Sequence, residues 1–274
     1  MRMDVRLLLF IVILLASLIS LLARFVGPNL FIGFRIGFTM IDERIWRRTH
    51  ELSAVIFFIS SLIFYLLTLL TRDLLVMLAI FISLMLISTA FIILKSVEYA
   101  EKITGFEPAA TEEIKPIEPL TAPHAKRILY MILAVFLIVL IASLMTLPET
   151  IAVRFDLAGN PVAWQDKYSF LVSISMLILS VAITIRIVVY IGEKHPIVFY
   201  SGVISRKWGK KALYLLTIYS LEITEVFFIL VLLIINLYNS YRIKILVESV
   251  FLLPFLIITV VFLPFLIVYL KRKT

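Results

Sequence analysis

The feature that most constrains this chain is a set of seven long runs made almost entirely of apolar residues. They are Val5–Ala23, Leu52–Leu70, Leu74–Leu94, Ile128–Thr146, Ser169–Ile191, Leu213–Leu237 and Ile245–Leu270. The hydrocarbon core of a bilayer is about 30 Å thick, and an α-helix needs about 20 residues to cross it. We therefore predict an all-α, polytopic integral membrane protein with about seven transmembrane helices. Pro254 and Pro264 predict a kink or a short break in the last one.

The composition supports lipid as the solvent of most of this chain. Hydrophobic residues make up 62% of the 274 positions and charged residues 16%, and the mean hydropathy is +1.11. A soluble domain of this length would have to expose large apolar patches. The period-two alternation of a membrane β-barrel is absent, so helices must satisfy the backbone hydrogen bonds in lipid.

The net charge of +8 is explained by membrane topology rather than by nucleic acid. Cytoplasmic loops of membrane proteins are enriched in Lys and Arg. With the N-terminus outside, the inner segments 24–51, 95–127, 192–212 and the C-terminal tail hold 18 Lys and Arg, against 7 in the outer segments. Arg2 and Arg6 alone favour the opposite orientation. We predict a multi-pass protein of the cell membrane with its N-terminus outside, its C-terminus cytoplasmic, and no direct nucleic acid binding.

The sequence predicts two membrane modules joined by a linker. Residues 1–96 form a front module of three helices, and residues 128–274 form a back module of four. Between them, residues 97–127 contain six Glu and four Pro without a periodic apolar face, which predicts a flexible cytoplasmic linker. The loop 147–168 between the fourth and fifth helices is predicted to be extracytoplasmic, with a turn at Gly159-Asn160-Pro161 and an interfacial Trp164.

The loop between the first two runs is unusually polar. Thr39 and Asp42 have the spacing of a capping box, which predicts a short interfacial helix before the second span. Glu43, Trp46 and His50 would then share one helix face. One interpretation is an interfacial anchor with Trp46 at headgroup depth, but this leaves the other polar residues of the loop unexplained. The candidate ligand or partner surface is therefore Asn29, Gly33, Arg35, Thr39, Glu43, Trp46 and His50.

This loop also carries a family resemblance. The series is Asn29…Ile32-Gly33-Phe34-Arg35…Thr39…Asp42-Glu43…Trp46…Thr49-His50. It resembles the signature of the SdpI family, polytopic membrane proteins named after a bacterial immunity protein against a secreted toxic peptide. The resemblance implies a non-catalytic role in immunity to a membrane-active peptide or in membrane signalling. A peptide toxin or a cytoplasmic regulator would be the partner, beside the lipid bilayer itself.

A second resemblance concerns the loop 147–168. Its Leu147-Pro148 start and its Gly159, Trp164 and Lys167 are similar to a membrane module of unknown function that often accompanies the SdpI module. Here the order of the two modules is reversed. Ala152 replaces the usual Pro, and Arg154 replaces the usual His, which argues against a proton or metal role at that position.

Three charged residues lie within predicted spans, where charges are costly and are usually paired or functional. Arg186 is in the fifth span, and Glu222 and Glu225 are in the sixth. Their positions along the two helices allow an Arg186–Glu222 pair. Either a structural ion pair or a proton or cation pathway would explain them, and the second makes a small transporter or channel-like protein the alternative function. An accessory membrane subunit is a further alternative.

Enzyme and metal chemistry find no support in the sequence. The chain has no cysteine, so disulfides and thiolate metal sites are excluded. His50, His124 and His195 all lie on inner segments but lack the spacing of metal ligands. No nucleophile elbow, phosphate-binding loop or dinucleotide motif occurs. We expect no enzyme activity, no metal and no cofactor.

Overall fold

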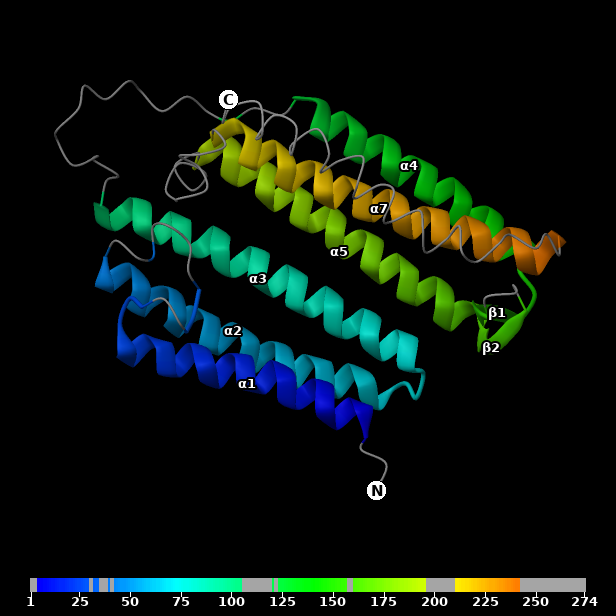
Figure 1. Cartoon of the computed structure of the whole chain (residues 1–274), viewed down its shortest axis with the longest axis horizontal. Coiled ribbons are helices and arrows are strands. Elements are labelled where there is room, and N and C mark those ends of the chain that lie inside the picture. Colours follow the sequence, from blue (N-terminus) through cyan, green and yellow to red (C-terminus); the bar gives the residue numbers. More distant parts are fainter. Residues whose placement is uncertain are drawn as a thin grey trace, which may run out of the picture. The chain divides into compact units, whose positions relative to one another are not determined.

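The structure, a computed structural model, describes residues 4–29, 32–34, 39, 42–104, 120, 123–156, 160–195 and 210–241. The helices are α1 (Val5–Val26), α2 (Glu43–Leu69), α3 (Leu74–Thr104), α4 (Pro123–Thr146), α5 (Lys167–Lys194) and α7 (Lys210–Tyr241) (Figure 1). Within these residues, six helices are long and apolar enough to cross a membrane. The first six predicted spans are thereby confirmed as helices. The seventh, Ile245–Leu270, lies outside the described residues.

The chain divides into two compact units. The first comprises Met1–Pro123 and Ile183–Ile218, and the second comprises His124–Ala182 and Tyr219–Thr274. The sequence placed all of residues 128–274 in one module, whereas this division assigns the second half of α5 and the start of α7 to the first unit. Two limits of the predicted linker also differ, because α3 continues to Thr104 and α4 already begins at Pro123.

In the first unit, α1, α2 and α3 lie side by side and run alternately up and down (Figure 1). The buried residues of α1 are Ile13, Ser17, Ser20 and Ala23, spaced along a single helix face. Ser17 Oγ donates to the carbonyl of Ala54 at 2.7 Å, which joins α1 to α2. The hydroxyls of Ser60 and Ser88 lie 2.8 Å apart and join α2 to α3. Small residues allow close approach of membrane helices, so these serines hold the unit together.

In the second unit, a two-stranded antiparallel hairpin interrupts the helices. It consists of β1 (Thr150–Phe155) and β2 (Pro161–Asp166). The sequence predicted only a loop here, so the fold is all-α apart from this hairpin. The Asn239 side chain of α7 fixes β1, because it accepts from Ala152 N–H at 2.8 Å and donates to Ala152 O at 3.0 Å. A proline at position 152, as in the resembled module, would lack the first of these bonds.

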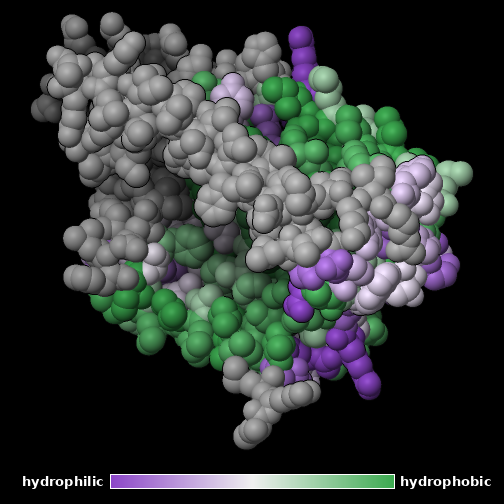
Figure 2. Space-filling view, turned by 45° about the vertical axis from the view of Figure 1, so that its right-hand side comes forward, coloured by the Kyte–Doolittle hydropathy of each residue, from purple (hydrophilic) through white to green (hydrophobic). Residues whose placement is uncertain are grey.

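The helix surfaces are apolar over broad areas, as Figure 2 shows for one face. Exposed large hydrophobic residues occur on every long helix, for example Phe25 with 73% and Met145 with 82% of their surface accessible. Such continuous apolar exposure is what a lipid-facing surface requires. The chain is a multi-pass membrane protein.

Candidate functional site

The loop between α1 and α2 is tied to both helices by two buried rings. His50 and Trp46 of α2 are both 0% exposed. Phe34 N–H donates to His50 Nε2 at 2.8 Å, and His50 Nδ1 lies 2.8 Å from the carbonyl of Trp46. Because Nε2 accepts, the proton of the imidazole must be on Nδ1, which donates to that carbonyl. His50 is therefore neutral here, and both of its ring nitrogens are engaged.

Gly33 is the residue that lets the loop approach His50. Its φ is +101°, a backbone conformation that side-chain-bearing residues rarely adopt. A Cβ at this position would overlap the His50 imidazole. Gly33 thus meets two requirements at once, a left-handed backbone and a close contact with a ring.

Trp46 caps a carbonyl at the C-terminal end of α1. Its indole N–H donates to the carbonyl of Ala23 at 2.7 Å. The last four carbonyls of a helix have no partner within that helix, and that of Ala23 is one of them. The Trp46 and His50 rings lie 4.0 Å apart between centroids. We call Ala23, Gly33, Phe34, Trp46 and His50 the α1–α2 junction.

The predicted interfacial anchor is wrong for Trp46, which is fully buried rather than placed at a headgroup surface. The predicted short helix is also wrong, because α2 is continuous from Glu43 to Leu69. Its N-cap is Asp42, whose side chain accepts from Arg44 N–H at 2.7 Å. Thr39 does not cap α2, since its hydroxyl donates to the carbonyl of Phe34 at 2.8 Å.

Asp42 also forms an ion pair at the start of α2. Arg44 Nη2 lies 2.8 Å from Asp42 Oδ2. The hydrogen bond from the Arg44 side chain lowers the pKa of the Asp42 carboxyl. The charged, helix-capping form of Asp42 is thereby favoured over a wider pH range than for a free aspartate.

The other members of the predicted surface are placed as follows. Asn29 forms a turn with its neighbours, since its Oδ1 accepts from Ile32 N–H at 2.9 Å. Glu43 is exposed and pairs with Arg47 at 2.8 Å, so it does not join Trp46 and His50. Arg35 lies outside the described residues. The structure therefore brings together Gly33, Thr39, Trp46 and His50. Phe34, which was not among the predicted surface residues, links them.

The predicted intramembrane charges have contrasting surroundings. Arg186 is exposed on α5. Glu222 and Glu225 of α7 are 6% and 0% exposed. Within the described part of the chain, Glu222 Oε1 and both carboxylate oxygens of Glu225 have no hydrogen-bond partner. The pairing of Arg186 with Glu222 stays a prediction.

The histidine side chains that the structure describes form no metal centre. His195 Nδ1 lies 2.7 Å from Glu101 Oε2. The side chain of His124 lies outside the described residues. Among the residues that are described, no group of three metal-ligating side chains is placed to hold an ion.

Comparison with known proteins bears on the part of the chain that holds the junction. Residues 26–95 match the model of the SdpI/YfhL protein family. No curated protein matches the chain, and no solved structure does. The match begins at the last residue of α1, contains the loop and α2, and ends within α3. The second resemblance, at the loop 147–168, stays a prediction. The loop signature and this match agree that residues 26–95 of this membrane protein are similar to the SdpI/YfhL protein family.

Proposed function

We propose that this protein acts without catalysis, in protection against a membrane-active peptide or in relaying a membrane signal. The observation that carries the proposal is the family match over residues 26–95, which contains nearly the whole α1–α2 junction. We further propose that the protein lies in the cell membrane with its N-terminus outside. The junction and its basic flank would then face the cytoplasm, where a regulator could bind.

The chemistry of the junction fits a binding role better than a reaction. Both nitrogens of His50 and the indole N–H of Trp46 contact the backbone. These contacts hold the loop and the first turns of α2 in one arrangement. Next to them, Arg44 and Arg48 are exposed on α2. A rigid loop beside exposed guanidinium groups suits recognition of a peptide or an acidic protein surface.

Arg35→Ala is expected to abolish protection while leaving the amount of protein in the membrane unchanged. Arg35 is a loop cation in the family signature, so its loss would remove a contact to the partner rather than a core contact. Survival of a sensitive bacterial host exposed to a secreted membrane-active peptide measures the effect. Arg47→Ala is the control, because Arg47 is exposed and paired with Glu43. Equal survival with both variants would contradict the proposal.

A transport function is the second candidate, and the burial of Glu222 and Glu225 favours it. Carboxylates without hydrogen-bond partners inside an apolar helix are typical of proton or cation pathways. In this case Glu225→Gln abolishes ion flux into proteoliposomes of the purified protein, because an amide cannot take up or release a proton. The exposed Glu43→Gln serves as the control. Wild-type vesicles that show no flux above empty vesicles would exclude transport of the ions tested.

A further inference from the structure

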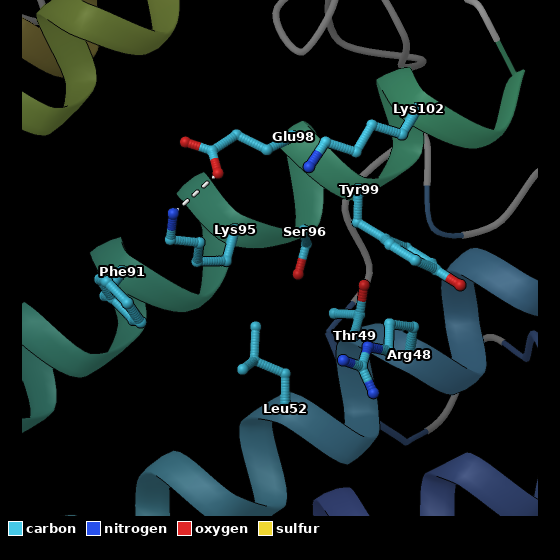
Figure 3. A pocket seen from close by; sticks show the side chains of 9 residues that line it. All are labelled: Arg48, Thr49, Leu52, Phe91, Lys95, Ser96, Glu98, Tyr99 and Lys102. Atoms are coloured by element: carbon cyan, nitrogen blue, oxygen red, sulfur yellow. Dashed lines mark hydrogen bonds and ion pairs between the residues drawn. The ribbon is translucent and has the colours of Figure 1, made fainter.

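A pocket of about 330 Å³ opens between α2 and α3, apart from the contacts of the α1–α2 junction (Figure 3). Both helices belong to the first unit. Arg48, Thr49 and Leu52 line the pocket from α2, and six residues of α3 between Phe91 and Lys102 line it from the other side. Its volume lies in the range of small-ligand sites, and it stands at the end of the helices predicted to be cytoplasmic.

Two buried hydroxyls line the pocket without a partner of their own. Thr49 is 1% exposed and Ser96 is 2% exposed. Within the part of the chain that the structure describes, neither Thr49 Oγ1 nor Ser96 Oγ has a hydrogen-bond partner. Figure 3 shows both oxygens directed toward the space between the helices. Buried polar groups in native proteins are nearly always paired, so these two donors call for an acceptor that enters the pocket.

Neighbouring hydroxyls on the same helices behave differently. Ser53 Oγ donates to the carbonyl of Thr49 at 2.7 Å, the usual bond of a serine within a helix. Ser60 of α2 and Ser88 of α3 bond to each other. The unpaired state of Thr49 and Ser96 is therefore a property of the pocket and not of hydroxyls in these helices.

The charge at the mouth of the pocket favours an anion. Arg48, Lys95 and Lys102 line the pocket together with one carboxylate, that of Glu98, and Arg48 also pairs with Glu51 at 3.3 Å. Lys95 Nζ and Glu98 Oε2 lie 2.8 Å apart. The Arg48 guanidinium lies 5.9 Å from the centre of the Tyr99 ring, which orients it at the rim. Guanidinium, ammonium and hydroxyl donors together match the oxygens of a phosphate group.

The end of the pocket farther from the predicted cytoplasmic side is apolar. Leu52 of α2 and Phe91 of α3 line the pocket at positions farther from the predicted cytoplasmic helix ends than the cations. An anionic group among the polar side chains would thus continue into an apolar tail beside Leu52 and Phe91. The pocket lining thus matches a lipid at a membrane interface, with polar donors for the headgroup and an apolar surface for the tail.

We propose that the pocket binds a phosphate group carried on an apolar tail, the chemistry of an anionic phospholipid. The Thr49 and Ser96 hydroxyls donate to phosphate oxygens, and Arg48 with Lys95 neutralises the charge. A free phosphate ion shares the headgroup chemistry but lacks the tail. The site does not depend on the proposed protective or signalling function, which concerns the α1–α2 loop.

The test uses the purified, delipidated full-length chain in a neutral detergent. Native mass spectrometry measures its affinity for dihexanoyl phosphatidylglycerol, dihexanoyl phosphatidylcholine and inorganic phosphate. The anionic lipid is expected to bind at least about tenfold more tightly than the zwitterionic one. Competition by inorganic phosphate would identify a free-phosphate site, whereas a requirement for the lipid would identify a headgroup site. Equal binding of both lipids overturns the proposal.

Variants separate the pocket from general surface charge. Thr49→Val and Ser96→Ala each weaken binding by about tenfold, the effect of one hydrogen bond to a charged group. Without ligand, both variants raise the unfolding midpoint, because each removes a buried hydroxyl without a partner. Arg48→Gln weakens binding, while the matched Arg47→Gln, one position outside the pocket, does not. Unchanged affinity in the Thr49→Val/Ser96→Ala protein, or equal losses for Arg47→Gln and Arg48→Gln, contradicts a phosphate site here.

Discussion

Replacing Gly33 with alanine is expected to lower the free energy of unfolding by about 2–6 kcal/mol. A residue with a side chain at a φ of +101° carries about 1–3 kcal/mol of backbone strain. The new Cβ would also overlap the His50 imidazole, and such overpacking costs about 1–3 kcal/mol more. Unfolding by sodium dodecyl sulfate in mixed micelles, followed by tryptophan fluorescence, measures the change.

Gly27→Ala is the matched control for this prediction. Gly27 also has a positive φ, +76°, but a Cβ there would meet nothing within 4 Å. Its replacement therefore reports backbone strain alone, about 1–3 kcal/mol. The difference between the two variants isolates the contact with His50. A double-mutant cycle of Gly33→Ala with His50→Ala should show coupling, because removal of the ring relieves the overlap. Equal losses for Gly27→Ala and Gly33→Ala would refute the close contact.

Trp46→Ala is expected to destabilise the protein by about 3–5 kcal/mol, the usual cost of removing a buried aromatic side chain. Trp46→Phe keeps most of the ring but leaves the Ala23 carbonyl without its 2.7 Å donor, which costs about 1–3 kcal/mol. The two variants therefore separate packing from the hydrogen bond that joins α1 to α2. The same detergent titration measures both, with the fluorescence of the remaining tryptophans as the signal.

Trp164 provides the comparison within the same chain. It lies on β2 with 53% of its surface exposed. Trp164→Ala should change the free energy of unfolding by less than about 1 kcal/mol. If Trp46→Ala had an equally small effect, Trp46 would be the interfacial anchor that the sequence suggested, and the junction would not hold the loop.

Most of the architecture could be read from the chain, because a membrane makes one physical demand on every residue of a span. Runs such as Leu74–Leu94 and Ser169–Ile191 leave no other structure that satisfies the backbone in lipid. Short elements were harder to predict from the sequence. The alternation in Thr150–Phe155 is brief and half-buried, and the strand depends on Asn239, a residue 87 positions away in sequence from Ala152. No local pattern reveals such a partner.

In the candidate site, too, some features could be predicted from the sequence and others depended on contacts between distant residues. The helical spacing of Trp46 and His50, and the place of Gly33 in the family signature, identified residues that do meet. The capping box was misread because Asp42 and Thr39 are both good N-caps, and only the fold shows that the Thr39 hydroxyl donates to Phe34 O. Glu43 shares a helical period with Trp46 and His50, yet it faces outward at the first turn of α2.

The sequence by itself determined the membrane class, the position of the spans and the family loop, because hydropathy and local motifs act over neighbouring residues. The tertiary structure decided which polar groups are paired. The indole of Trp46 in α2 donates to the carbonyl of Ala23 in α1. The imidazole of His50, 17 residues after Gly33, leaves no room for a side chain at Gly33. The α2–α3 pocket depends on bringing Thr49 and Ser96 together, 47 positions apart. Such contacts follow from helix packing and register, which a linear pattern of residues does not specify.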